Sequence, residues 1–360
     1  MRAALLLALL MPLAAWGGAP FAPKVPLDAI DGIWVDRAVL AALPMRGAAW
    51  DALAAAAREP LPGPDLSDQE DPTNVRVLAR ALVFARTGDE TLRQQVIRAC
   101  MAAIGTEAGG RTLSLGRELA AYVIAADLVR LPTDEDARFR AFLRSVRDRK
   151  LKRRTLRSTQ EDRPNNWGTH AAASRIAVAL YLRDATDLAR AARVFKGYLG
   201  DRDAYAGFRY GALDWQAAPD EPVGINPKGA RKKGHDVDGI PPDDQRRCCS
   251  EFRWPPPREN YVWEAMQGAL AAAVMLDRAG YDVWQWEDRA LYRVLRWLHE
   301  VADYPARGDD TWQPHVVNHY YGTTFPAPVP SRSGKNVGFT DWTHGGRRAG
   351  AEHRASSPTR

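Results

Sequence analysis

The sequence predicts an all-α fold assembled from helical hairpins. Apolar residues recur at spacings of three and four through most of the chain, and short breaks rich in Pro, Gly and Asp separate these stretches. The 360 residues are 46% hydrophobic and 26% charged, which allows a sizeable core and excludes a collagen, a coiled coil or a wholly disordered chain. Helical hairpins fit a closed ring, the α/α toroid, and an open stack about equally well. No repeat of fixed period is visible, which makes a consensus solenoid less expected, and the pattern alone does not choose between ring and stack.

The periodicity places helices, in chain order, at residues 46–58, 73–86, 90–104, 115–131, 134–150, 165–182, 185–199, 261–279 and 283–301. The turn signals between them include Gly88-Asp89, Pro132 and Gly280. Residues 201–260 and 305–345 interrupt this rhythm and are rich in Gly, Pro, Asp and aromatic residues. Because long irregular stretches inside a compact protein usually serve a function, we expect both to lie across one mouth of the scaffold.

The N-terminal segment predicts export. Arg2 is followed by an apolar run over residues 3–16 and then by small residues, and this run is too short to span a bilayer. The pattern is typical of a secretory signal peptide, with a buried helix as the alternative. We expect a signal peptide over 1–19, one domain over 20–344 and a disordered basic tail over 345–360. The mature protein would then be periplasmic or secreted, with no stable membrane insertion.

The net charge of +6 is unevenly distributed, with basic clusters at 147–157, 228–233 and 246–247. Such clusters attract polyanions, although each one is also typical of a solvated helix end. An exported protein meets acidic polysaccharide more often than nucleic acid, so the polysaccharide is the expected partner. The oligomeric state is left open.

Three cysteines do not make a disulfide framework. Cys100 lies in an apolar helical stretch and is expected in the core, whereas Cys248 and Cys249 either form a vicinal disulfide or remain reduced. No Cys/His spacing resembles a structural zinc site, and no metal ligand is assigned.

The first motif that suggests chemistry is the segment 163–170, RPNNWGTH. Either Asn165 or Asn166 can cap the helix that begins here. Asn166 and His170 are four residues apart and share a helix face, so an amide and an imidazole together can bind a carboxylate. The alternative is a cap followed by a packed histidine.

The second motif is the segment 253–264, RWPPPRENYVWE. Three prolines force an extended backbone, and Asn260 can cap the helix that follows. Tyr261 then stands in the first turn with Arg253 or Arg258 nearby, and a guanidinium lowers the pKa of a phenol, which would let Tyr261 act as a base. A tyrosine simply packed at a helix start is the alternative.

These two motifs, in this order, resemble the alginate-lyase-like polysaccharide lyases. The resemblance implies that the fold is an α/α toroid, an incomplete barrel of helical hairpins. In that family an Asn-Asn-His segment binds the uronate carboxylate and a downstream Tyr is base and acid, so the resemblance implies these roles for Asn166 and Tyr261. The family His corresponds to Trp167 and the family Arg to Trp254 in this chain. His170 and Arg253 are the nearest replacements.

The chemistry explains this choice of residues. β-Elimination removes the C5 proton of a uronate, which is hardly acidic until donors such as Asn166, His170 and an arginine neutralise the neighbouring carboxylate. Tyr261 then takes the proton, and Tyr261 or a histidine returns one to the glycosidic oxygen. No organic cofactor is required, and a divalent cation is an open alternative.

The other candidate site residues are His319 as acid or base and, as substrate contacts, Asn165, Arg258, Trp215, Trp254, His235, Tyr320 and Tyr321. For the segment 309–321 a packed aromatic cap is an equal alternative, and for His235 a mobile charged loop is the alternative. Trp215 and Trp254 lie in irregular sequence, where aromatic rings can stack on sugars.

The expected function is therefore that of an exported lyase acting on a uronate polymer such as alginate or glucuronan. The first rival is a glycoside hydrolase on the same toroid, with Asp309 or Asp310 paired with Asp236 or Glu264. The second rival is a periplasmic protein that binds acidic glycans without cleaving them. Which uronate is recognised, and whether cleavage is internal or terminal, is left open.

Overall fold

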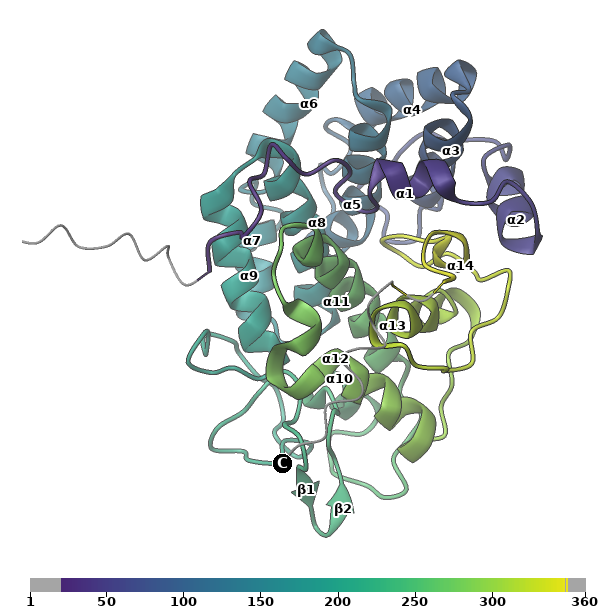
Figure 1. Cartoon of the computed structure of the whole chain (residues 1–360). Coiled ribbons are helices and arrows are strands. Elements are labelled where there is room, and N and C mark those ends of the chain that lie inside the picture. Colours follow the sequence, from purple (N-terminus) through teal and green to yellow (C-terminus); the bar gives the residue numbers. More distant parts are fainter. Residues whose placement is uncertain (1–20, 347, 349–360) are drawn as a thin grey trace, which may run out of the picture.

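The computed structural model describes residues 21–346 and Arg348, which form a mostly helical body (Figure 1). Its α-helices are α1 (Arg37–Ala42), α2 (Ala48–Ala56), α3 (Thr73–Thr87), α4 (Glu90–Ala103), α5 (Thr112–Val129), α6 (Thr133–Val146), α7 (Leu156–Asp162), α8 (Asn166–Leu182), α9 (Ala185–Leu199), α10 (Pro242–Gln245), α11 (Asn260–Arg278), α12 (Trp286–Arg296), α13 (Gln313–Tyr321) and α14 (Thr340–Thr343). The strands β1 (Arg231–Lys232) and β2 (His235–Asp236) make one short antiparallel hairpin. The all-α prediction is confirmed.

Local signals in the sequence account for the helix ends. The Asp89 and Asp184 side chains accept backbone N–H groups at the starts of α4 and α9. Gly88 ends α3 in the left-handed conformation that glycine adopts without strain. The predicted helix at 283–301 is instead divided, because a 3-10 turn at Val283–Gln285 precedes α12 and a wider turn at Trp297–Val301 follows it.

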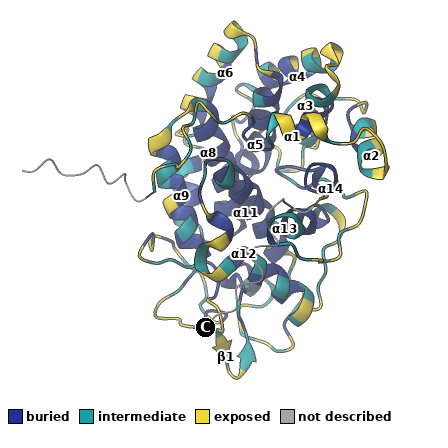
Figure 2. Ribbon diagram, in the orientation of Figure 1, coloured by how far each residue is buried: buried dark blue, intermediate teal, exposed yellow. Residues whose placement is uncertain are grey.

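The helices form two layers around a continuous core. Figure 2 shows α5, α8 and α11 almost wholly buried in the middle of the molecule, whereas α4, α6 and α9 each keep one face exposed. Sequential pairs such as α3–α4 and α8–α9 pack as hairpins with one member in each layer. This arrangement is compatible with an α/α toroid.

The inner helices approach closely through small residues. A Cβ on Gly116 of α5 would lie 2.9 Å from the backbone nitrogen of Ala171. One turn further along both helices, the Ser174 hydroxyl accepts from the Ala120 N–H at 3.0 Å. Because the residue numbers rise in both helices from the first contact to the second, α5 and α8 run in the same direction. On α11, Gly268 packs directly against the backbone of Thr169 in α8.

Two predictions concern chain ends that lie outside the described residues: the signal peptide at 1–19 and most of the tail at 345–360. Within the part of the chain that the structure describes, no helix is both long and apolar enough to cross a membrane. Cys100 is buried as predicted, and Cys248 and Cys249 form a disulfide.

Candidate active site

Three charged or polar side chains meet where the second turns of α5, α8 and α11 come together. Arg117 of α5 and Glu264 of α11 form a close ion pair. The Nε2 atom of His170, from α8, lies 3.6 Å from the same Glu264 oxygen. We call these residues, Arg117, His170 and Glu264, the inner triad. Since each stands five or six residues into its helix, the N-terminal ends of the three helices share one mouth of the scaffold.

The surroundings of the inner triad set its charges. His170 is completely buried, and this burial lowers the pKa of its imidazole. Burial also opposes the ionisation of Glu264, but His170 and Arg117 beside it overcome this and lower the pKa of its carboxyl to about 2. The triad therefore holds a fixed carboxylate, a fixed guanidinium and an imidazole that favours its neutral form.

The segment 309–336 adds a second group of polar residues to this mouth. Lys335 pairs with Glu70 at 2.5 Å and with Asp309 at 3.4 Å. Oδ1 of the buried Asp310 accepts from the amides of Gln267 at 3.0 Å and Gln313 at 2.9 Å. Burial raises the pKa of Asp310 to about 8. Asp310 is thus a carboxylic acid that favours its protonated form, near the ionised Glu264.

Asn165 and Asn166 lie at the start of α8, packed against the short helix α10. Asn165 is the N-cap of α8 and donates from Nδ2 to Asp243 at 2.7 Å. The backbone N–H of Asn166 donates to Asp244 at 3.0 Å, while both polar atoms of its buried side chain lack a hydrogen-bond partner among the described residues. An unsatisfied buried amide costs about 1–3 kcal/mol, so this side chain is a candidate ligand contact.

Tyr261 stands in the first turn of α11, exposed, with the guanidinium of Arg247 4.0 Å from the centre of its ring. Neither arginine predicted for this place occupies it. Arg258 is exposed and pairs with Asp303, and Arg253 is exposed in the loop before Trp254. The physical reason is that the turn after α10 brings Arg247 to the helix start, whereas Arg258 is held by Asp303. Asp244 and Arg247, three residues apart, connect the starts of α8 and α11.

The structure separates a second group of predicted residues from this mouth. The His319 ring faces the Gly346 carbonyl, and its centre lies 5.1 Å from that of the His344 ring. Tyr320 stacks on Trp284 with ring centres 3.9 Å apart. Arg348 lies over Tyr320 and pairs with Asp277. Asp277 is sixteen residues beyond Tyr261 on α11, which corresponds to about 24 Å along a helix axis. The expectation that His319, Tyr320 and Tyr321 join Tyr261 in one site is therefore wrong.

The aromatic residues predicted to stack on sugars differ in exposure. Trp215 is fully buried beneath Phe252, with ring centres 4.9 Å apart, so the prediction of a sugar contact there is wrong. Trp254 is half-buried and stacks on His235 with ring centres 4.4 Å apart and an angle of 12° between the planes. Trp254 and His235 of β2 form a partly exposed aromatic pair beside the hairpin β1–β2.

The basic cluster at 147–157 is partly internal. Arg147 pairs with Asp184, Arg149 with the buried Glu107, Arg154 with Asp162, and Arg157 with Asp148 and Asp187. Lys150, Lys152 and Arg153 are exposed between these anchors. Glu107 precedes the start of α5 and Asp162 precedes the start of α8. Asp184 and Asp187 instead follow the end of α8, so the segment is anchored along the length of this helix. We call the three exposed cations, which lie on the turn between Arg149 and Arg154, the basic rim.

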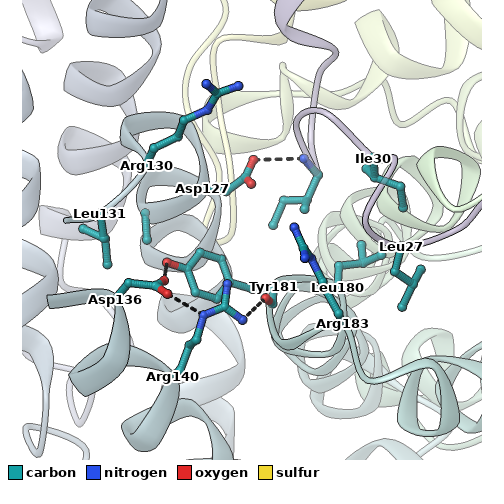
Figure 3. A pocket seen from close by; sticks show the side chains of 12 residues that line it. Leu27, Ile30, Asp127, Arg130, Leu131, Asp136, Arg140, Leu180, Tyr181 and Arg183 are labelled. Atoms are coloured by element: carbon teal, nitrogen blue, oxygen red, sulfur yellow. Dashed lines mark hydrogen bonds and ion pairs between the residues drawn. The ribbon is translucent and has the colours of Figure 1, made fainter. Parts of the chain in front are cut away.

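A surface pocket of about 240 Å³ lies at the opposite ends of α5 and α8 (Figure 3). Its polar groups largely bond to one another: Asp136 accepts from Tyr181 at 2.6 Å and from Arg140 at 2.6 Å, and Asp127 accepts from the Ile33 N–H at 3.1 Å. None of the predicted site residues lines it. Among the described residues, no three His, Cys, Asp or Glu side chains are grouped as metal ligands would be.

Sequence reasoning missed Arg117, Lys335 and Asn336. Arg117 lies inside an apolar helix without a motif, and only its contact with Glu264, 147 residues away, identifies it. Glu264 follows Tyr261 by three residues and so lies on the same helix face. This spacing could have identified Glu264 as a site residue of a lyase as well as of the hydrolase alternative. Lys335 and Asn336 carry no signal in the sequence.

Comparison with known proteins supports the resemblance seen in the motifs. Residues 88–205 match the model of the family described as alginate lyase. The matched range runs from the end of α3 past α9 and includes Arg117, Asn165, Asn166 and His170. No curated protein matches the chain. The family match indicates a polysaccharide lyase, with a polysaccharide as its substrate.

Proposed function

We propose that this chain is an exported lyase that cleaves a uronic-acid polysaccharide, alginate- or glucuronan-like, by β-elimination. The observation that carries the proposal is the meeting of Asn166, Tyr261 and the inner triad at the N-terminal ends of α8 and α11. Helix N-termini carry partial positive charge and unpaired N–H groups, which favour a bound carboxylate. The basic rim, flanked by ion pairs to residues that precede α5 and α8, suits an acidic polymer.

The reaction places distinct demands on these residues. The unpartnered amide of Asn166 and the guanidinium of Arg247 neutralise the uronate carboxylate. Arg247 thereby takes the role that we expected for Arg253. Tyr261 removes the C5 proton, the C4–O4 bond breaks, and its electrons leave with O4 as the C4–C5 double bond forms. A proton then returns to O4 from Tyr261. No organic cofactor takes part in this sequence, and the half-buried pair of Trp254 and His235 offers a further sugar contact.

The test is the ultraviolet absorbance of the unsaturated product, measured with the mature protein on alginates, glucuronan and related acidic glycans. We expect absorbance to rise on one class of polymer. Tyr261→Phe and Asn166→Ala should each reduce the rate at least 100-fold, because each removes a group that acts in the transition state. Tyr292→Phe, a half-buried tyrosine on α12, is the matched control and should keep wild-type activity. Full activity in Tyr261→Phe would refute the assigned base.

A glycoside hydrolase is the second candidate, and the protonation of Asp310 and Glu264 favours it. Two carboxyl groups whose pKa values are shifted in opposite directions, to about 8 and about 2, are typical of an acid and a carboxylate acting together. This reading predicts new reducing ends without ultraviolet absorbance. It also predicts that Asp310→Asn abolishes turnover while Tyr261→Phe does not. Binding without either product would instead favour a non-catalytic glycan-binding protein.

A further inference from the structure

Asn336, from the segment that follows α13, has its side-chain orientation fixed by its neighbours. It is completely buried, and its Nδ2 donates to the carbonyl oxygens of Gly116 at 2.8 Å and Arg117 at 3.2 Å. Both partners can only accept, so the nitrogen of the amide must face them. The oxygen of the amide must therefore face the other way, toward His170.

This orientation decides which nitrogen of His170 carries a proton. Oδ1 of Asn336 lies 2.5 Å from Nδ1 of the imidazole. An amide oxygen only accepts, so Nδ1 is the donor and bears hydrogen. In a neutral imidazole with hydrogen on Nδ1, the other nitrogen, Nε2, has a free lone pair.

The charged groups that face His170 come from two helices. Burial and Arg117 of α5 disfavour a positive charge on the imidazole, whereas Glu264 of α11 and the side chain of Asn336 favour it. Glu264 already pairs closely with Arg117, and its 3.6 Å separation from Nε2 is too long for a hydrogen bond. Nε2 lacks a hydrogen-bond partner among the described residues. Beyond these, Lys335, next to Asn336, directs its charge to Glu70 and Asp309.

We propose that Asn336 is a positioning residue that holds His170 as the Nδ1–H tautomer and so keeps Nε2 as a hydrogen-bond and proton acceptor. The consequence for catalysis rests on the proposed function. Since Nε2 has no hydrogen to give, His170 does not donate to the substrate carboxylate. Neutralisation of the carboxylate then falls to Asn166 and an arginine.

The tautomer is measured directly by long-range ¹H–¹⁵N correlation spectra of the full chain labelled with ¹⁵N-histidine, without substrate. The sequence has seven histidines, and the spectrum of His170→Gln identifies the signals of His170. At neutral pH we expect Nδ1 to have the shift of a protonated nitrogen and Nε2 that of an unprotonated one. The Nε2–H tautomer, or protonation of both nitrogens, would overturn the proposal. This result does not depend on any enzymatic activity, so an inactive protein would count against the function alone.

Asn336→Asp tests the coupling in a second way. It retains the acceptor and adds a negative charge beside Nδ1, which should raise the pKa of His170 by about 1–3 pH units. The acidic limb of the kcat/KM profile should move upward by the same amount. Asn226→Asp, at another fully buried asparagine that bonds Trp215 and Ala217, should leave both unchanged. An unshifted His170 titration in Asn336→Asp would contradict the proposal, and if this variant does not fold, the wild-type spectrum alone decides.

Discussion

At the scale of single residues, two carboxyl groups at one mouth are driven toward opposite protonation states by their immediate partners. Glu264 has the guanidinium of Arg117 against one oxygen, and its charge is compensated. Asp310 is equally enclosed, but its Oδ1 receives only the neutral amides of Gln267 and Gln313. Amide donors compensate a buried negative charge less than a cation does, so Asp310 retains its proton where Glu264 loses it.

Asp310 should therefore make the stability of the protein fall as pH rises. The pKa of its carboxyl is about 8 in the fold and about 3.9 in an unfolded chain, so protonation stabilises the fold below about pH 4 and this contribution is lost as pH rises to 8. Asp310→Asn, whose amide oxygen can still accept from both glutamines, should lack this loss. We expect urea unfolding at pH 8 to show the variant roughly 2–5 kcal/mol more stable, relative to wild type, than at pH 4.

Asp303→Asn is the control for that measurement, because Asp303 is exposed and pairs with Arg258. Its stability should follow the wild-type pH dependence. If Asp310→Asn follows the wild-type curve as well, the carboxyl of Asp310 is ionised in the folded protein at neutral pH, and its role as the acid of a hydrolase would also lose support.

At the scale of elements, the inner triad depends on how closely α8 and α11 approach. A Cβ on Gly268 would lie 2.3 Å from the carbonyl carbon of Thr169 and 2.4 Å from the nitrogen of His170. Both are backbone atoms, which cannot move without moving the whole helix. Glycine at this position is thus what allows His170 and Glu264 to face each other across the two helices.

Gly268→Ala should separate α8 from α11. We expect a loss of about 1–3 kcal/mol of unfolding free energy, as for other overpacked cores, together with a clear loss of turnover. Gly63→Ala is the matched control, because a Cβ on Gly63 would meet no atom within 4 Å. Thermal unfolding of both variants checks the first effect and the product assay the second. Equal stability of the two variants would show that the helices accommodate the methyl group.

The difference between local helix signals and contacts between distant helices explains how much of the structure the sequence predicted. Helices and most of their caps follow from local signals. The all-α fold and a cap at Asn165 or Asn166 were predicted from them, whereas Glu259, not the expected Asn260, caps α11. The position of a side chain relative to distant helices does not follow from local signals. Arg247 replaced Arg253 beside Tyr261 because of a turn, and His319 lies at the other end of α11 because a nineteen-residue helix separates its two ends. Asn336 meets His170 across 166 residues of sequence.

At the scale of the whole molecule, charge is arranged relative to the two ends of the inner helices. The basic rim of Lys150, Lys152 and Arg153 lies on a turn flanked by the ion pair of Arg149 with Glu107, before the start of α5, and by that of Arg154 with Asp162, before the start of α8. Arg130 and Arg183 are exposed at the opposite ends of α5 and α8, beside the pocket in Figure 3. The position of the charges on the molecule is therefore more informative about the substrate than the net charge.

This arrangement predicts that equal losses of charge at the two ends have unequal effects. Replacing the basic rim with glutamines, Lys150→Gln, Lys152→Gln and Arg153→Gln, should raise KM for the acidic polymer roughly three- to ten-fold at low ionic strength. The effect should disappear toward 0.5 M salt, where the Debye length is about 4 Å, and kcat should not change. The control removes the same charge from the other end, with Arg130→Gln, Arg183→Gln and Arg138→Gln, and should leave KM at the wild-type value. Arg138 is exposed on α6, between the pocket residues Asp136 and Arg140. If both triple variants raise KM equally, the polymer responds to net charge, and the mouth at the N-terminal ends of α5 and α8 is not where it is recruited.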